Sequence, residues 1–202
     1  MIPKDLNKIF ERFCEDELDI SITKVEFLEN IFTINFSLMS ISTEEEINAN
    51  DQLWTIQTVG HKKNKISFDK GSEIRIEQDH PLLWEYNDVN CELYFNGSSS
   101  DSNKLHVALY KLHFELFKNY IPAGTYFNAL YSYDLLKARN GLLARGPKRL
   151  MMKYAECLRH AGVDFSILEG RAKLENNLVI LFIDNADTYI IAEDFSFFRQ
   201  SV

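Results

Sequence analysis

The sequence predicts an α+β fold: a mostly antiparallel sheet with three or four helices packed on one face. Short apolar segments of alternating polarity, separated by turn residues, fill the first half of the chain. Apolar residues then recur at helical spacing, and alternation returns near the C-terminus. Because no internal repeat and no long linker interrupts this order, we expect a single domain over residues 1–202. It would comprise a strand-rich part (1–96), a helical part (97–162) and C-terminal strands (163–202).

The strand-rich part begins with a short helix, predicted over residues 3–14 because its apolar side chains share one helical face. Polarity then alternates over residues 20–27 and 31–39, and Glu29-Asn30 between them suits a hairpin turn. Residues 43–51 are a polar, acidic connector. The remaining strand candidates cover residues 53–59, 65–68, 73–77, 82–86 and 91–95. Their close spacing indicates an antiparallel meander, because parallel crossovers need more intervening chain.

The helical part opens at a turn rich in helix-capping residues. Leucines at helical spacing predict a first helix over residues 103–120. We expect a second helix over 126–139, which Asn140-Gly141 would end. Pro147 would occupy the first position of a third helix, which ends before Gly162. Three further strands are predicted, over residues 164–168, 177–183 and 188–192.

Composition limits the classes of partner. The chain has 22 basic and 30 acidic residues, a formal net charge of -8 and a pI near 5.2. Because an acidic protein repels polyanions, we expect neither nucleic-acid nor membrane binding. The three cysteines form no CxxC pair, and residues 1–13 lack the apolar core of a secretory signal. The longest apolar stretch, residues 178–183, is too short to cross a bilayer. We therefore expect a cytoplasmic protein with reduced thiols.

One segment stands out against this acidic background. Residues 137–153, KARNGLLARGPKRLMMK, contain six basic residues and no acid, and we call them the basic island. Its helix start leaves backbone N–H groups unsatisfied and directs the positive end of the helix dipole outward. Such a site attracts phosphate, sulfate or carboxylate. The residues predicted to bind an anion or a partner are Arg139, Arg145, Gly146, Lys148, Arg149 and Lys153.

The basic island is not a nucleotide-binding P-loop. Pro147 separates Gly146 from Lys148, no hydroxyl residue follows the lysine, and the preceding segment is predicted to be helical instead of a strand. The alternative interpretation is a helix hairpin whose basic side chains are solvated or paired with the acidic body. Both interpretations remain open from the sequence.

Aromatic residues precede the basic island. Tyr126, Tyr131 and Tyr133 are candidate contact residues, since tyrosines beside arginines are enriched at interfaces. The alternative is that these tyrosines pack in a core between two helices, with their hydroxyl groups at its edge.

Catalytic and metal-binding patterns are weak. His106 and His113 share a helix face but lie about 10 Å apart along it, which is too far for one metal. Cys157 and His160 are three residues apart and could form a dyad or two metal ligands, although no further ligand has suitable spacing. No nucleophile elbow is present. We therefore predict no catalytic residue, no metal and no cofactor.

The sequence thus favours an interaction or regulatory domain that contacts a protein partner, or forms a homo-oligomer, and leans away from an enzyme. The alternative is a small-molecule-binding protein or enzyme whose anionic ligand is held at the Gly146 helix start.

Overall fold

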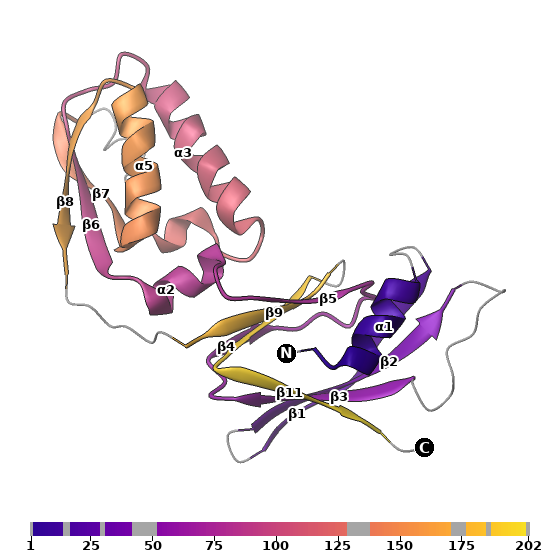
Figure 1. The fold of residues 1–202 in the computed structure, drawn as a ribbon. Helices are drawn as coiled ribbons and strands as arrows, with labels where there is room; N and C mark the ends of the chain where they lie inside the picture. Colours follow the sequence, from indigo (N-terminus) through magenta and orange to yellow (C-terminus); the bar gives the residue numbers. More distant parts are fainter. Residues whose placement is uncertain are drawn as a thin grey trace. The chain divides into compact units, whose positions relative to one another are not determined.

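The computed structural model describes residues 2–13, 17–28, 31–41, 52–128, 138–170, 177–184 and 187–200. As predicted, the fold class is α+β, and the paired strands are antiparallel (Figure 1). The chain forms two compact units: residues 1–80 together with 177–202, and residues 81–176. We call them the terminal unit and the central unit. The expectation of a single domain stays a prediction.

The terminal unit combines one helix with eight strands in the described residues. Helix α1 spans Lys4–Arg12. The first sheet has the order β1-β2-β3-β11, and the second has the order β4-β10-β9-β5. The strands are β1 (Leu18–Leu28), β2 (Ile31–Ser40), β3 (Leu53–Val59), β4 (Lys63–Lys65), β5 (Ile74–Glu77), β9 (Val179–Ile183), β10 (Thr188–Ala192) and β11 (Asp194–Arg199).

Both sheets and α1 contribute to one hydrophobic core. The alternation in the sequence explains it: Ile34 and Phe36 of β2 are buried opposite Ile56 and Trp54 of β3, while the residues between them face outward. Leu6 of α1 is fully buried in the same cluster. The predicted helix over 3–14 and the hairpin strands are therefore confirmed within the described residues.

The central unit contains the basic island. Its three-stranded sheet has the order β7-β6-β8, with β6 (Asn90–Asn96) between β7 (Asn140–Pro147) and β8 (Asp164–Glu169). Helices α3 (Ser102–Phe117) and α5 (Lys148–His160) lie on one face of this sheet (Figure 1). Two short elements precede β6, a 3-10 turn η2 (Pro81–Leu83) and α2 (Trp84–Asn87), and a second 3-10 turn η3 (Ala123–Thr125) follows α3.

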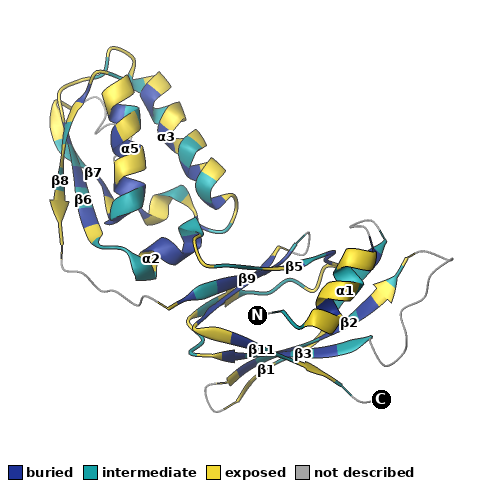
Figure 2. Cartoon of the chain, viewed as in Figure 1, coloured by how far each residue is buried: buried dark blue, intermediate teal, exposed yellow. Residues whose placement is uncertain are grey.

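Apolar residues alternate along the strands and recur at helical spacing along the helices, so each of these elements has one buried side (Figure 2). Cys91, Leu93 and Phe95 of β6 face the helices, and the residues between them face away. The helices contribute Leu105, Leu109, His113 and Phe117 from α3 and Leu150, Met151, Tyr154, Ala155 and Leu158 from α5. On its other face the sheet carries no helix formed by the described residues.

Several predicted elements are wrong. Residues 82–86 form η2 and α2 instead of a strand. Residues 140–147, predicted as the end of a helix and a loop, form strand β7. The candidate strand 65–68 overlaps β4 only at Lys65, and β11 was not predicted. Of the predicted helix over 126–139, residues 129–137 lie outside the described part of the chain. Its described ends are not helical, since Phe127 pairs with Ala144 of β7.

Charge divides between the two units. The terminal unit has 10 basic and 20 acidic residues, a net charge of -10, whereas the central unit has 12 basic and 10 acidic residues, a net charge of +2. The acidity that dominates the composition therefore belongs to the terminal unit. None of the helices formed by the described residues is long and apolar enough to cross a membrane.

Candidate functional site

The face of the central sheet that points away from α3 and α5 is the candidate site. The pairing of the strands determines which residues lie on this face, because residues directly opposite one another on antiparallel strands point to the same side. Glu92 lies opposite Arg145 and Leu168, and Tyr94 lies opposite Leu142 and Ser166. We call these six residues the open sheet face.

A chain of polar contacts organises the open sheet face. The Arg145 guanidinium pairs with Glu92, with 2.9 Å between Nε and Oε1. The Tyr94 hydroxyl donates to the other carboxylate oxygen of Glu92 at 2.7 Å, which raises the pKa of Tyr94. The Arg145 side chain is nevertheless 64% exposed. Because a guanidinium has five N–H donors, Arg145 is oriented by Glu92 and still presents donors to a binding partner.

The surface is hollowed on both sides of Arg145. One hollow, of about 290 Å³, lies between Arg145 and Leu168. The other, of about 330 Å³, is lined by Leu142 and by residues 125–128. Both are open to solvent and at the lower limit of size for small-molecule pockets. They suit the side chains of a second macromolecule better than they suit an enclosed cofactor.

Leu168 is the exposed apolar residue of this face. It is 56% exposed, although it lies within a strand and beside one of the hollows. Leu142, on the far side of Arg145, is half-buried. A tyrosine and an oriented arginine are residue types that protein interfaces favour, and the exposed Leu168 adds apolar surface beside them.

The start of helix α5 does not lie on the open sheet face. The Asp88 carboxylate accepts a hydrogen bond from the Arg149 backbone N–H at 2.6 Å, and the Lys148 N–H donates to the Val89 carbonyl at 2.8 Å. The Arg149 guanidinium lies 3.7 Å from Asp88 and stacks over the Trp84 ring. Asp88 therefore already supplies the anion that this helix terminus attracts.

Two further basic side chains of the island, Lys148 and Lys153, also pair with acids. Lys148 pairs with Glu169 of β8, an ion pair that raises the pKa of Lys148, and Lys153 lies 3.8 Å from Glu156 on the same helix. Arg139 stands at the beginning of β7, where its carbonyl accepts from Gly97 N–H. The structure thus distributes the predicted residues over β7, α5 and its start, and only Arg145 lies on the open sheet face. The predicted helix–loop–helix junction is instead a strand–helix junction.

Gly146 has a packing role. A Cβ atom at this position would lie 2.8 Å from Cδ1 of Tyr126. Tyr126 itself is buried, and its hydroxyl donates to Glu85 at 2.9 Å. Its ring therefore supports β7 from inside the unit instead of facing a partner. Tyr131 and Tyr133, the other predicted aromatic contacts, lie outside the described residues.

His113 and Cys157, two residues considered for catalysis or metal binding, have pKa values shifted by burial. His113 is buried between the Tyr154 hydroxyl (2.7 Å from Nδ1) and the Ile121 carbonyl (2.8 Å from Nε2), and burial lowers its pKa. Burial also raises the pKa of the Cys157 thiol, which disfavours the nucleophilic thiolate. Cys157 and His160 border one small hollow. Within the described ranges, no three His, Cys, Asp or Glu side chains group closely enough to hold a metal ion.

Comparison of the chain with protein-family models, with curated proteins and with solved structures gives no match.

The sequence alone did not identify Glu92, Leu168 and Asp88 as residues of the site or of its surroundings. Glu92 and Leu168 are separated from Arg145 by 53 and 23 positions, and Asp88 is 61 positions from Arg149. Alternation in β6 and β8 indicated which residues point away from the core. Without the pairing of β7, nothing indicated that they share a face.

Asp88 gives a first prediction. We expect Asp88→Ala to lower the free energy of unfolding by ~0.5–2 kcal/mol, because α5 loses the side chain that caps it. Urea unfolding followed by circular dichroism measures the change. Asp164→Ala is the control, since this exposed acid caps no helix, and its effect should stay below about 0.5 kcal/mol. Equal effects of the two substitutions would contradict the capping role.

Proposed function

We propose that the chain is a non-enzymatic interaction or regulatory domain, and that the open sheet face contacts a protein partner. The observation that carries this proposal is the pair of hollows on either side of the exposed, Glu92-oriented Arg145. The expected partner offers an apolar side chain to the hollow beside Leu168 and a carboxylate or carbonyl oxygen to the free donors of Arg145.

The chemistry of the face favours protein over nucleic acid. Arg145 is paired with Glu92, so the face has no unbalanced positive charge to attract phosphates. Tyr94 is the single aromatic ring among the six residues of the face and is tied to Glu92, and Leu142 and Leu168 offer no further stacking surface for successive bases. Arginine and tyrosine are instead enriched in interface hot spots, and here they lie beside the exposed Leu168.

The alternative, an anionic ligand at the Gly146 helix start, is less well supported. The carboxylate of Asp88 accepts from the first free N–H group of α5, so a ligand anion would have to displace it. Gly146 is also explained by the approach of the Tyr126 ring without any ligand. We therefore favour the protein partner.

Affinity capture with site-directed variants tests the proposal. We expect a discrete partner to copurify with the wild-type chain and to be lost with Arg145→Glu and with Leu168→Asp. Truncating a hot-spot residue near the centre of an interface costs ~2 kcal/mol or more, about a thirtyfold loss of affinity.

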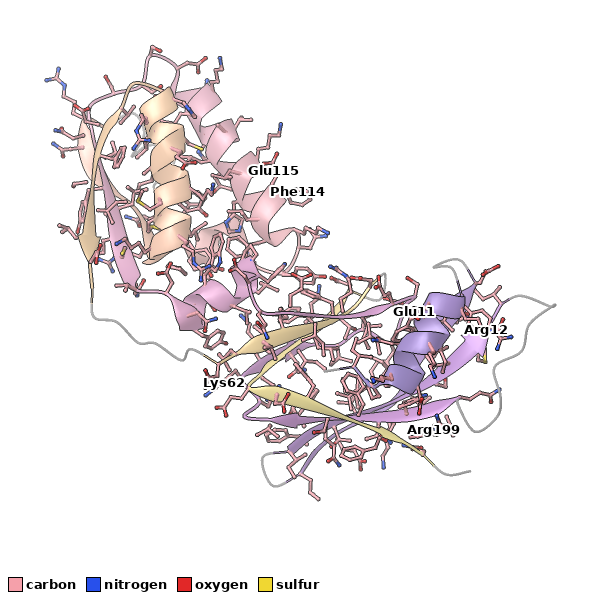
Figure 3. The ribbon with its side chains drawn as sticks, in the orientation of Figure 1. Glu11, Arg12, Lys62, Phe114, Glu115 and Arg199 are labelled. Atoms are coloured by element: carbon pink, nitrogen blue, oxygen red, sulfur yellow. The ribbon has the colours of Figure 1, made fainter. Side chains whose placement is uncertain are left out.

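The matched control is Val107→Asp on α3. Val107 is exposed like Leu168 but belongs to a helix on the other side of the sheet. Phe114 and Glu115 on the same helix also project away from α5 (Figure 3). A partner that stays bound to both sheet-face variants, or that is lost equally with Val107→Asp, would overturn the proposal.

A further inference from the structure

Strand β8 presents an open edge of the central sheet. On the β7 side the sheet is extended by Phe127, which pairs with Ala144, and by Asn128 N–H, which donates to the Leu143 carbonyl. On the other side, no strand of the described residues pairs with β8 beyond β6. Such an edge presents unpaired N–H and C=O groups that another strand can complete.

The β6–β8 register identifies which groups are unpaired. Gly170 N–H donates to the Asn90 carbonyl at 2.8 Å, and the register from there to Asp164 is unbroken. Backbone groups alternate in direction along an antiparallel strand, so residues 164, 166 and 168 also bond toward β6. The N–H and C=O groups of Phe165, Ile167 and Glu169 therefore point to the open edge.

These three residues are arranged symmetrically about Ile167. If two copies of β8 pair antiparallel about a two-fold axis at Ile167, each Phe165 lies opposite Glu169 of the other copy. All three outward residues then exchange both of their hydrogen bonds, six bonds in total for the pair of strands. No like charges face one another, because Asp164 lies opposite Gly170 and Ser166 opposite Leu168.

Side chains on the helix side of β8 fit the same register. Arg159 of α5 lies over the Phe165 ring, 5.4 Å from its centroid, and has no acidic partner among the described residues. Glu169 pairs with Lys148 of its own chain. In the dimer it would also stand opposite Phe165 of the second copy, within reach of the Arg159 guanidinium there. Met152, 43% exposed, lies on the same side of α5 as Arg159 and Lys148, which contact Phe165 and Glu169 of β8. It would cover the apolar contact between the two Ile167 side chains.

We propose that the chain forms a two-fold dimer in which β8 pairs with β8 of a second copy, joining the two three-stranded sheets into one of six strands. The dimer does not depend on the proposed function. It places Ser166 and Leu168 beside the second copy and leaves Glu92, Tyr94, Leu142 and Arg145 of each open sheet face away from the new strand pair.

The mass of the full chain in solution is the first test. Sedimentation equilibrium should give a concentration-dependent species of twice the 23.5 kDa chain mass. Ile167→Pro should weaken dimerisation about tenfold or more, because proline removes the N–H at the two-fold axis without removing a bond to β6. A chain that stays monomeric at every concentration, or whose dimer is unaffected by Ile167→Pro, would overturn the proposal.

Charge exchange tests the side-chain register independently of the backbone. Arg159→Glu and Glu169→Arg should each weaken the dimer, and the double variant should recover most of the loss, since it recreates the pair between copies. Lys111→Glu on α3 is the control and should leave the mass unchanged. Losses that simply add in the double variant would contradict the register.

Cysteine cross-linking locates the axis. Opposite residues of a hydrogen-bonded pair lie about 5.5 Å apart, which a disulfide can span. Mild oxidation should therefore link two copies of Ile167→Cys but not two copies of Asp164→Cys, whose positions would lie about 20 Å apart. The wild-type chain controls for its own cysteines. Equal linking of the two variants, or linking of β8 to a different protein only, would refute the dimer.

Discussion

Replacing Gly146 by alanine should lower the free energy of unfolding by ~1–3 kcal/mol, although it adds only one methyl group. The added Cβ would lie 2.8 Å from Cδ1 and 3.3 Å from Cε1 of Tyr126. The ring has little freedom to retreat, because the Tyr126 hydroxyl is bonded to Glu85 and its carbonyl accepts from Arg145 N–H at 3.0 Å. Thermal and urea unfolding measure the loss.

A double-mutant cycle separates this clash from a general intolerance of alanine in β7. In the background of Tyr126→Ala, the further change Gly146→Ala should cost little, since the ring that it meets has gone. The same loss in both backgrounds would refute the packing role of Gly146. It would reopen the interpretation in which glycine is needed for a ligand to approach the backbone.

Replacing Tyr154 by phenylalanine should also cost ~1–3 kcal/mol, because it leaves a buried acceptor unsatisfied. His113 Nε2–H donates to the Ile121 carbonyl, so the neutral ring must accept at Nδ1, and the Tyr154 hydroxyl is the donor there. Both side chains are buried. Tyr94→Phe is the control, since it removes a hydroxyl from the partly exposed sheet face and should cost less. Equal costs would contradict a special role for the buried pair.

His113 also makes stability depend on pH. Burial lowers the pKa of His113 in the folded state, so below about pH 6.5 the unfolded chain binds protons that the folded chain resists. The contribution of His113 to the free energy of unfolding is therefore fully present above about pH 6.5 and is lost as the pH falls toward its folded-state pKa. His61 in the terminal unit has a lowered pKa for the same reason and contributes in the same direction. His113→Gln should flatten part of the dependence, and an unchanged pH profile would count against this account.

Periodicity predicted the elements whose burial is one-sided. Alternation located β2, β3 and β6, and leucine spacing located α3. It failed where a short segment is apolar throughout: Leu82, Leu83 and Trp84 are all buried, so a strand and a helical turn leave the same pattern. It also failed at β7, where Asn140-Gly141 resembles a helix end and Gly146 interrupts the strand pattern. Gly146 is explained only by the Tyr126 ring, 20 residues away in the chain.

The basic island could be found from the sequence, but its meaning could not. Its charge is offset by Asp88, Glu92 and Glu169, which reach it only through the antiparallel pairing of β6 with its two neighbours. Long-range pairing of this kind leaves no local signal. The same pairing places Arg145 on the open sheet face, whereas Lys148, Arg149 and Lys153 belong to α5.

A photo-crosslinking residue at position 168 tests the central claim most directly. Leu168 stands at the hollow that we expect a partner side chain to fill, whereas position 107 on α3 is equally exposed and lies off the open sheet face. Irradiation in living cells should give a discrete adduct with another protein from position 168 and not from position 107. The β8 dimer, in which Leu168 lies opposite Ser166 of the second copy, is expected to add a crosslink between two copies of this chain at position 168. No adduct with a different protein from position 168, or the same adducts from both positions, would contradict the assignment of the open sheet face to a protein partner.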